Sequence, residues 1–146
     1  MPEFKGEEQI RAPVNRVWDF LSDPSKVSGC IPGAKNVEVV DENTFKADVS
    51  VAVGFIRNTY KVTFKTLDKK PPGFAKLGIS GQGGGSNLNG EALVDLAEAN
   101  GSTRLAYTAN VVVGGSLAGI GSRFINGTAD KIIREMFGCV KKSLEG

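Results

Sequence analysis

The amino-acid sequence predicts an α+β domain in which a curved antiparallel sheet of about seven strands wraps around a long C-terminal helix. Apolar and polar residues alternate from about Lys35 to Val113, as they do in half-buried strands that have one solvated face. After Leu117 the apolar residues recur every three or four positions, which indicates an amphipathic helix of about 25 residues. A helix of this length buries its apolar stripe only against a large surface, so we expect the sheet to curl around it.

One strand and two short helices are predicted before the main part of the sheet. Phe4 to Arg11 is a strand candidate that contains many charges. Pro13 suits the first position of a helix, and the apolar residues that follow it have the spacing of one helix face. Asp23 and Pro24 are typical of an N-cap and a first helical position, so they predict a second helix, which the turn-forming segment 29–33 keeps short.

The alternation is clearest in three strands, which lie at residues 45–53, 60–64 and 105–113. Further strands are expected near residues 74–82 and 88–98. The breaks between strands are short enough for hairpins, and they lie at residues 41–43, 54–58, 70–73 and 100–102. Strands that follow one another through hairpins form an antiparallel sheet.

The composition limits the chemistry that the protein can perform. The chain has 146 residues, no His and two Cys, and no linker divides it, so we treat residues 1–146 as one domain. The absence of His excludes a Ser-His-Asp triad, a Cys-His pair and a His-ligated zinc site. Cys30 and Cys139 are too few for an all-thiolate zinc site, and their separation matches no redox or metal spacing. We therefore expect neither a metal site nor catalytic residues.

Charge and hydropathy are typical of a soluble cytoplasmic protein. Eighteen Lys and Arg against sixteen Asp and Glu give a net charge of +2, and the basic residues are scattered, so nucleic acid is not an expected partner. Residues 1–8 are acidic and contain no apolar core, unlike a signal peptide. The uncharged stretch 105–122 alternates in its first half, which favours a strand followed by a glycine loop over a membrane span. We expect at most peripheral contact with the inner face of the membrane.

Three motifs have both a structural and a functional interpretation. The segment Cys30-Ile-Pro-Gly33 predicts a packed cysteine in a tight turn, which also suits the rim of a cavity. Gly81 to Ser86 lies between strands and lacks the Gly-Lys-Ser/Thr ending of a phosphate loop, so a tight connection or bulge is favoured over phosphate binding. Ser116 is predicted to be the N-cap of the long helix; the alternative is that free N–H groups there bind an anion or a ligand oxygen.

Inward-facing apolar and aromatic residues either fill the core or line a pocket. A strongly curved sheet around one helix tends to leave space at its open end, where ligand pockets are usually found. The residues that we expect to contact a ligand there are Ile31, Phe45, Val49, Val51, Tyr60, Phe64, Tyr107, Val111, Leu117, Ile120 and Phe124.

The order of these elements resembles the helix-grip fold of the START and Bet v1-like (SRPBCC) superfamily, which has an apolar cavity between sheet and helix. Within that superfamily, the chain resembles the CoxG family of carbon monoxide dehydrogenase subunits in particular. The motifs that carry this resemblance are Cys30-Ile-Pro-Gly33, Gly83-Gly-Gly-Ser86, Val113-Gly-Gly115 and Gly121-Ser-Arg123. The similarity covers essentially the whole chain. It implies association with a molybdenum-dependent hydroxylase of the carbon monoxide dehydrogenase type and a role in linking that enzyme to the membrane.

The expected function is therefore that of a non-catalytic accessory protein that binds a lipophilic molecule in an apolar cavity. This role requires no cofactor, and a quinone is one ligand that fits, because such oxidoreductases pass electrons onward. One alternative is an enzyme of the cyclase or hydrolase kind, with Asp48, Asp95 and Glu98 as candidate acids or bases. Another is a recruitment factor without a ligand. The sequence leaves open the identity of the ligand, the partner's substrate and the oligomeric state.

Overall fold

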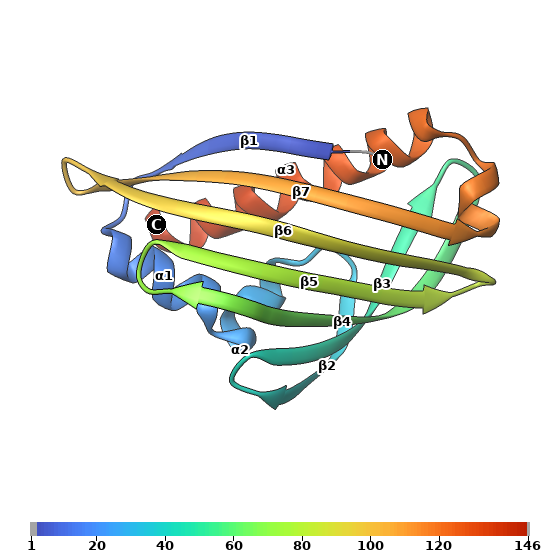
Figure 1. The fold of residues 1–146 in the computed structure, drawn as a ribbon, viewed down its shortest axis with the longest axis horizontal. Helices are drawn as coiled ribbons and strands as arrows, with labels where there is room; N and C mark the ends of the chain where they lie inside the picture. Colours follow the sequence, from blue (N-terminus) through green and yellow to red (C-terminus); the bar gives the residue numbers. More distant parts are fainter. Residues whose placement is uncertain (1–2, 146) are drawn as a thin grey trace.

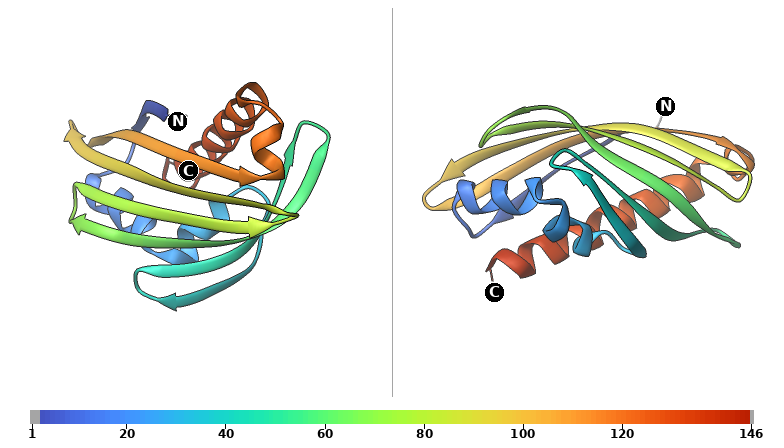
Figure 2. Two further views of the ribbon diagram at one scale, coloured as in Figure 1. Left: turned by 45° about the vertical axis from the view of Figure 1, so that its right-hand side comes forward. Right: turned by 90° about the horizontal axis from the view of Figure 1, so that it is seen from below.

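The computed structural model describes residues 3–145 and contains one antiparallel sheet of seven strands, with the helices on one of its faces (Figure 1, Figure 2). The strands are β1 (Glu3–Ile10), β2 (Ala34–Asp41), β3 (Thr44–Val53), β4 (Ile56–Lys70), β5 (Phe74–Gly83), β6 (Ser86–Ala99) and β7 (Ser102–Gly115). The α-helices are α1 (Val14–Ser22), α2 (Pro24–Val27) and α3 (Ser122–Glu145), and the two 3₁₀ helices are η1 (Ser28–Cys30) and η2 (Ser116–Gly119).

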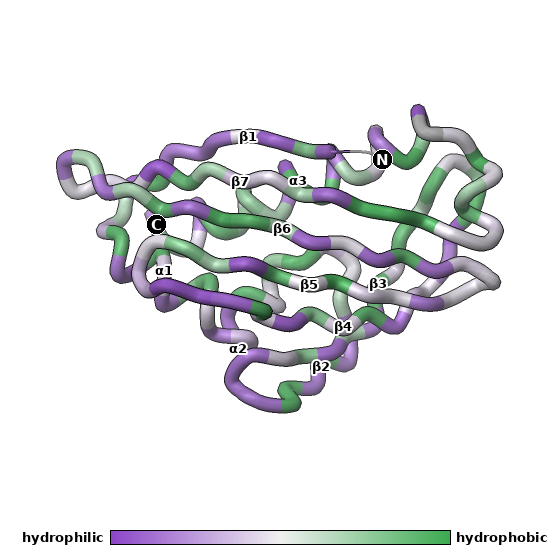
Figure 3. Tube along the Cα trace, in the orientation of Figure 1, coloured by the Kyte–Doolittle hydropathy of each residue, from purple (hydrophilic) through white to green (hydrophobic). Residues whose placement is uncertain are grey.

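The strand order β1-β7-β6-β5-β4-β3-β2 places β1 and β2 at the two edges of the sheet. Strands β2 to β7 form a meander, and β1 pairs with the outer side of β7. The sheet curves over α3 (Figure 2), and the alternation of hydrophobic and hydrophilic residues is visible along the strands in Figure 3. The predicted fold class is confirmed, including the two short helices after β1.

The buried core consists of two clusters, which lie at opposite ends of β7. The first cluster joins β1, α1, β7 and the second half of α3, and its members include Ile10, Val17, Leu105, Phe137 and Val140. The second cluster joins β3, β4 and η2, and its members include Ala47, Val49, Tyr60, Val62 and Leu117.

The glycine motif between β5 and β6 is a hairpin turn, as the sequence predicts. Gly84 and Gly85 occupy the turn with φ angles of 57° and 75°, a left-handed conformation that glycine adopts without a steric cost. The same hairpin holds the chain after β7. The backbone N–H of Ser116 donates to the carbonyl of Gly85 (3.2 Å), and that of Leu117 donates to the Ser86 hydroxyl (3.1 Å). These hydrogen bonds fix the point where the chain leaves the sheet towards α3.

The long helix begins later than predicted, because a glycine turn and η2 precede it. Gly115 has a φ angle of 72°, so the chain turns there. Ser116 opens η2 instead of capping α3, which begins at Ser122, and its hydroxyl oxygen lies 3.5 Å from the carbonyl oxygen of Gly85. The prediction that Ser116 is the N-cap of the long helix is therefore wrong, because the residue type alone does not reveal the 3₁₀ turn.

Cys30 and Cys139 form a disulfide bond that joins η1 to α3, with their Cα atoms 5.4 Å apart. Cys30 is buried at the end of η1, in agreement with the predicted packed cysteine in a turn, but the sequence gives no indication of its bond to Cys139. The two residues are separated by 109 positions and meet only because α3 packs beside η1. Their spacing in the sequence therefore carries no signal for the pair.

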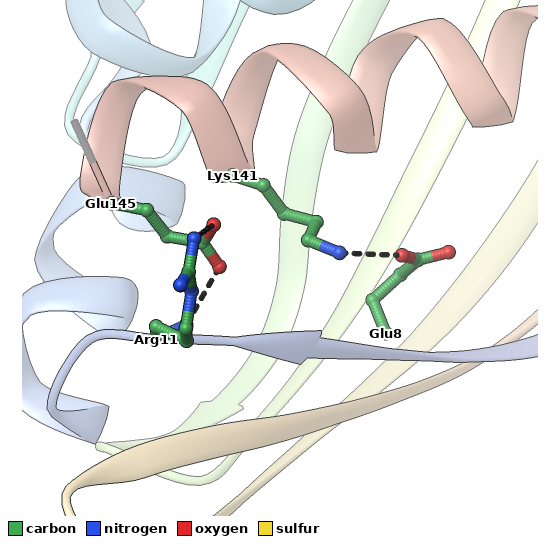
Figure 4. A network of polar contacts seen from close by, with 4 residues as sticks. All are labelled: Glu8, Arg11, Lys141 and Glu145. Carbon is green, nitrogen blue, oxygen red and sulfur yellow. Dashed lines mark hydrogen bonds and ion pairs between the residues drawn. The ribbon is translucent and has the colours of Figure 1, made fainter.

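Polar contacts also join the end of α3 to β1 and to Arg11, the residue that follows β1 (Figure 4). The carboxylate of Glu145 accepts a hydrogen bond from the backbone N–H of Arg11 (2.8 Å) and forms an ion pair with the Arg11 guanidinium (3.2 Å). Lys141 Nζ lies 3.8 Å from a carboxylate oxygen of Glu8. The hydrogen bond from the Arg11 backbone, more than any other contact, holds the pKa of Glu145 below its ordinary value of 4.5.

We expect Cys139→Ser to lower the free energy of unfolding by about 2–4 kcal/mol, because the disulfide constrains the unfolded chain. Urea denaturation of the oxidised wild type and of the variant measures this difference. Wild-type protein in the presence of a reductant should unfold at the same urea concentration as the variant. Equal midpoints for the oxidised wild type and the variant would contradict a stabilising disulfide between Cys30 and Cys139.

The lowered pKa of Glu145 predicts a pH-dependent contribution to stability. A carboxylate whose folded pKa lies below its unfolded value stabilises the fold fully above the unfolded pKa and loses that contribution as the pH falls through the folded pKa. The wild type should therefore be more stable than Glu145→Gln at neutral pH, and the difference should shrink below pH 4.5. Thermal melting of both proteins across this range measures the effect, and a difference that stays constant with pH would argue against it.

Candidate functional site

An apolar strip on the inner face of the sheet lies between the two core clusters. This inner strip consists of Leu77, Leu88, Ala92, Ala109 and Val111, which point to the side of α3 by the alternation of their strands. They belong to neither cluster and are only half-buried. Because α3 lies on this side of the sheet (Figure 2), these half-buried side chains retain accessible apolar surface on the face that the helix covers.

The helix α3 is packed against both clusters, so it bridges the inner strip. Ile125 contacts the second cluster, and Ile133 and Met136 contact the first. The Thr128 hydroxyl also lies 3.4 Å from the carbonyl oxygen of Ala52 in β3. The helix is thus held at two places with the inner strip between them.

Most of the predicted ligand-contacting residues come together around the second cluster. The buried ones are Phe45, Val49, Tyr60 and Leu117, and the half-buried ones are Ile31, Val51, Phe64 and Ile120. The rings of Phe45 and Phe64 stack with their centroids 4.8 Å apart. The half-buried residues retain surface that a ligand can cover, whereas the buried ones mainly support them.

Three predicted residues lie away from that cluster. Val111 is part of the inner strip, and Tyr107 packs against the first cluster. Phe124 is 48% exposed and lies beside Gly54, where an added Cβ would be 3.6 Å from its ring. The role of all these residues as ligand contacts stays a prediction.

The sequence reasoning misses the contribution of β1 to the inner face. Gly6 lies opposite Tyr107 in the β1–β7 register, and Glu8 lies opposite Leu105. The alternation in β1 places both residues on the side of α3. A strand in which a glycine and a glutamate take inward positions does not show the apolar alternation that identified the other strands.

Tyr107 is a polar residue on the inner face of β7 and lies next to Ala109 of the inner strip. Its ring stacks on Phe137 with the centroids 5.1 Å apart, and its hydroxyl lies over Gly6, where an added Cβ would be 2.5 Å from the oxygen. Burial raises the pKa of Tyr107, and the carboxylates of Glu8 and Asp130 raise it further. The hydroxyl therefore keeps its proton at neutral pH and is a hydrogen-bond donor.

The hairpin between β3 and β4 exposes aromatic surface. Phe55 is fully exposed at the turn and follows Gly54, which lies beside the ring of the exposed Phe124. The exposed Arg57 and Arg123 are near these two aromatic residues in the sequence. We call these four residues the aromatic tip. Exposed apolar groups next to cationic ones form a candidate contact surface for a partner or a membrane.

The outer face of the sheet carries two shallow depressions of about 640 and 1010 Å³. Both are open to solvent, and polar side chains such as Thr63, Ser80 and Asn89 line them. Within residues 3–145, no three Cys, Asp or Glu side chains are placed to hold a metal ion. None of the helices in the described part of the chain has the length and hydropathy needed to cross a bilayer.

Solved structures place this fold among known proteins. A conserved protein from Geobacillus kaustophilus is 33% identical, with a TM-score of 0.91 over 99% of this chain and 95% of that one. A START superfamily protein from Mycobacterium smegmatis is 11% identical, with a TM-score of 0.74 over 98% of this chain and 97% of that one. The Zhui aromatase/cyclase from Streptomyces sp. R1128 is 16% identical, with a TM-score of 0.70 over 99% of this chain and 93% of that one.

The last two similarities show that the fold is START-like. A search of curated proteins finds no sequence that matches this chain. Residues 6–145, however, match the family of carbon monoxide dehydrogenase subunits described as CoxG. The match covers nearly the whole chain, including the cysteine turn, the glycine hairpin and α3, so the chain belongs to the CoxG family.

Proposed function

We propose that this protein is a non-catalytic accessory protein that holds a lipophilic molecule between the sheet and α3 and serves a molybdenum hydroxylase of the carbon monoxide dehydrogenase type. The observation that carries the proposal is the inner strip, whose apolar side chains stay half-buried beneath a helix. Membership of the CoxG family and the START-like fold support a ligand-binding accessory role in general.

Apolar burial supplies the binding energy in this proposal. Covering about 200 Å² of apolar surface contributes about 5 kcal/mol before the entropic cost of association is subtracted. The half-buried Ile79, Val111 and Val113 offer aliphatic surface of the kind that a planar or isoprenoid molecule covers. A quinone is the ligand that we favour, since it is lipophilic and accepts the electrons that a hydroxylase of this type releases.

The aromatic tip is the face through which we propose that the protein contacts its partner enzyme. The β3–β4 turn and the start of α3, which carry these residues, lie at the opposite end of the sheet from the C-terminal end of α3 (Figure 1). We propose that the complex works in the cytoplasm, on the inner face of the membrane, where a lipophilic electron carrier is available.

An enzymatic role finds less support. Asp48 is on the outer face, where its carboxylate accepts a hydrogen bond from Asn36 (2.9 Å), and Asp95 and Glu98 are exposed. None of these three carboxylates faces the inner strip. A recruitment factor without a ligand would be more stable if the apolar side chains of the inner strip were fully buried. Their half-burial therefore argues against that alternative as well.

Binding of 2-methylnaphthalene, an apolar probe without oxygen atoms, tests the interior site. Val111→Phe places a larger side chain into the inner strip and should weaken binding about tenfold or more, which is about 1.4 kcal/mol. Val112→Phe is the matched control, because Val112 lies next to Val111 in β7 but on the outer face, and it should leave binding unchanged. Equilibrium dialysis measures both, with circular dichroism to verify folding.

Native mass spectrometry of protein from a quinone-producing host, followed by organic extraction, identifies what the site holds. An absence of probe binding and of any extracted lipophile would refute the interior site.

Replacing Phe55 by Ser should weaken binding to the purified hydroxylase about tenfold, because removal of an exposed aromatic anchor is costly when a partner covers it. Val40→Ser is the control, since Val40 is 52% exposed on the edge strand β2, away from the aromatic tip. Biolayer interferometry with the immobilised accessory protein measures the affinities. Equal losses for the two variants, or none for Phe55→Ser, would place the docking face elsewhere.

A further inference from the structure

Tyr107 lies where it can form a hydrogen bond to the polar end of a ligand in the interior site. It shares the inner face of β7 with Ala109 and Val111 of the inner strip, at successive alternate positions. Side chains two residues apart on one strand face are about 7 Å apart, so Tyr107 lies about that far from Ala109, the adjacent member of the inner strip on β7, and about twice as far from Val111. Tyr107 itself is half-buried between the first cluster and the strip.

The hydroxyl of Tyr107 is available to a ligand. None of the side-chain hydrogen bonds found among residues 3–145 involves it, and every fully buried polar side-chain atom in that part of the chain has a partner. The hydroxyl is therefore reached by solvent. Gly6 keeps this position open, because any side chain there would occupy the place of the hydroxyl.

The charges around the hydroxyl select the kind of oxygen that it can bind. Glu8 from β1 and Asp130 from α3 are near enough to disfavour the ionised form of Tyr107, and Lys141 from α3 offsets Glu8 at 3.8 Å. The surroundings are thus acidic on balance and would repel a carboxylate head group. A neutral carbonyl oxygen can accept the hydrogen bond without this repulsion.

We propose that the Tyr107 hydroxyl donates a hydrogen bond to a neutral carbonyl oxygen of the bound molecule, so that the protein selects lipophilic carbonyl compounds over hydrocarbons and fatty acids. This inference rests on the proposed function, because it requires a ligand in the interior site. It assigns to Tyr107 the specificity of that site, while the inner strip provides the apolar contact.

The test compares three probes, menadione, 2-methylnaphthalene and dodecanoate, in equilibrium dialysis with the wild type and with Tyr107→Phe. The first two share a ring system and differ in the carbonyl oxygens. Tyr107→Phe keeps the ring on Phe137 and should weaken menadione binding about tenfold, the usual effect of losing one hydrogen bond in a buried site. It should leave the affinity for 2-methylnaphthalene unchanged, and dodecanoate should bind the wild type more weakly than menadione.

Two further variants make the result specific. Gly6→Ala displaces the Tyr107 hydroxyl and should reproduce the loss of menadione affinity without deleting any polar group. Ser80→Ala removes a hydroxyl from the outer face of the sheet, outside the interior site, and should leave the affinities unchanged.

The outcomes separate the inference from the function on which it rests. If the wild type binds neither menadione nor 2-methylnaphthalene, the proposed function fails and this inference fails with it. If both bind but Tyr107→Phe weakens them equally or not at all, or if Ser80→Ala causes the selective loss instead, the role of Tyr107 is wrong and the interior site stands.

Discussion

The arrangement of the domain depends on how α3 is held against the curved sheet. At one end η2 is hydrogen-bonded to the β5–β6 hairpin through Ser86, and at the other the Cys30–Cys139 bond and the Glu145 contacts hold the helix. A helix that is fixed near both ends does not need to press against the sheet along its whole length. The inner strip can therefore stay half-buried without loss of the fold, and a site for an apolar molecule is compatible with a stable protein.

Much of the fold could be predicted from the sequence because its elements have strong local signals. The strands alternate, and α2 begins with the expected N-cap, in which the Asp23 carboxylate accepts a hydrogen bond from the Ser25 backbone N–H (3.0 Å). The start of α3 and the disulfide could not be predicted in this way. The first depends on the turn at Gly115, and the second depends on the packing of α3 beside η1, which no local pattern encodes.

The candidate site was only partly predictable for a similar reason. Alternation selects inward apolar residues such as Val111 and Phe64, but it does not distinguish residues that fill a cluster from those that border a space. The surroundings of Tyr107 depend on β1, which pairs with β7 across most of the length of the chain. Gly6 has no side chain and Glu8 is charged, whereas inward positions of a strand are usually apolar. Neither residue is therefore recognised as inward-facing from the sequence.

The disulfide makes a closed covalent ring of the chain from Cys30 to Cys139, which includes β2 to β7 and most of α3. The segments outside the ring, β1 with α1 and the end of α3, are two tails that meet again through Arg11 and Glu145. A protease that cuts the exposed Phe55 turn would open this ring without dividing the molecule, because the fragments would remain linked through sulfur and paired in the sheet. A cut before residue 30 would instead leave β1 attached by non-covalent contacts alone.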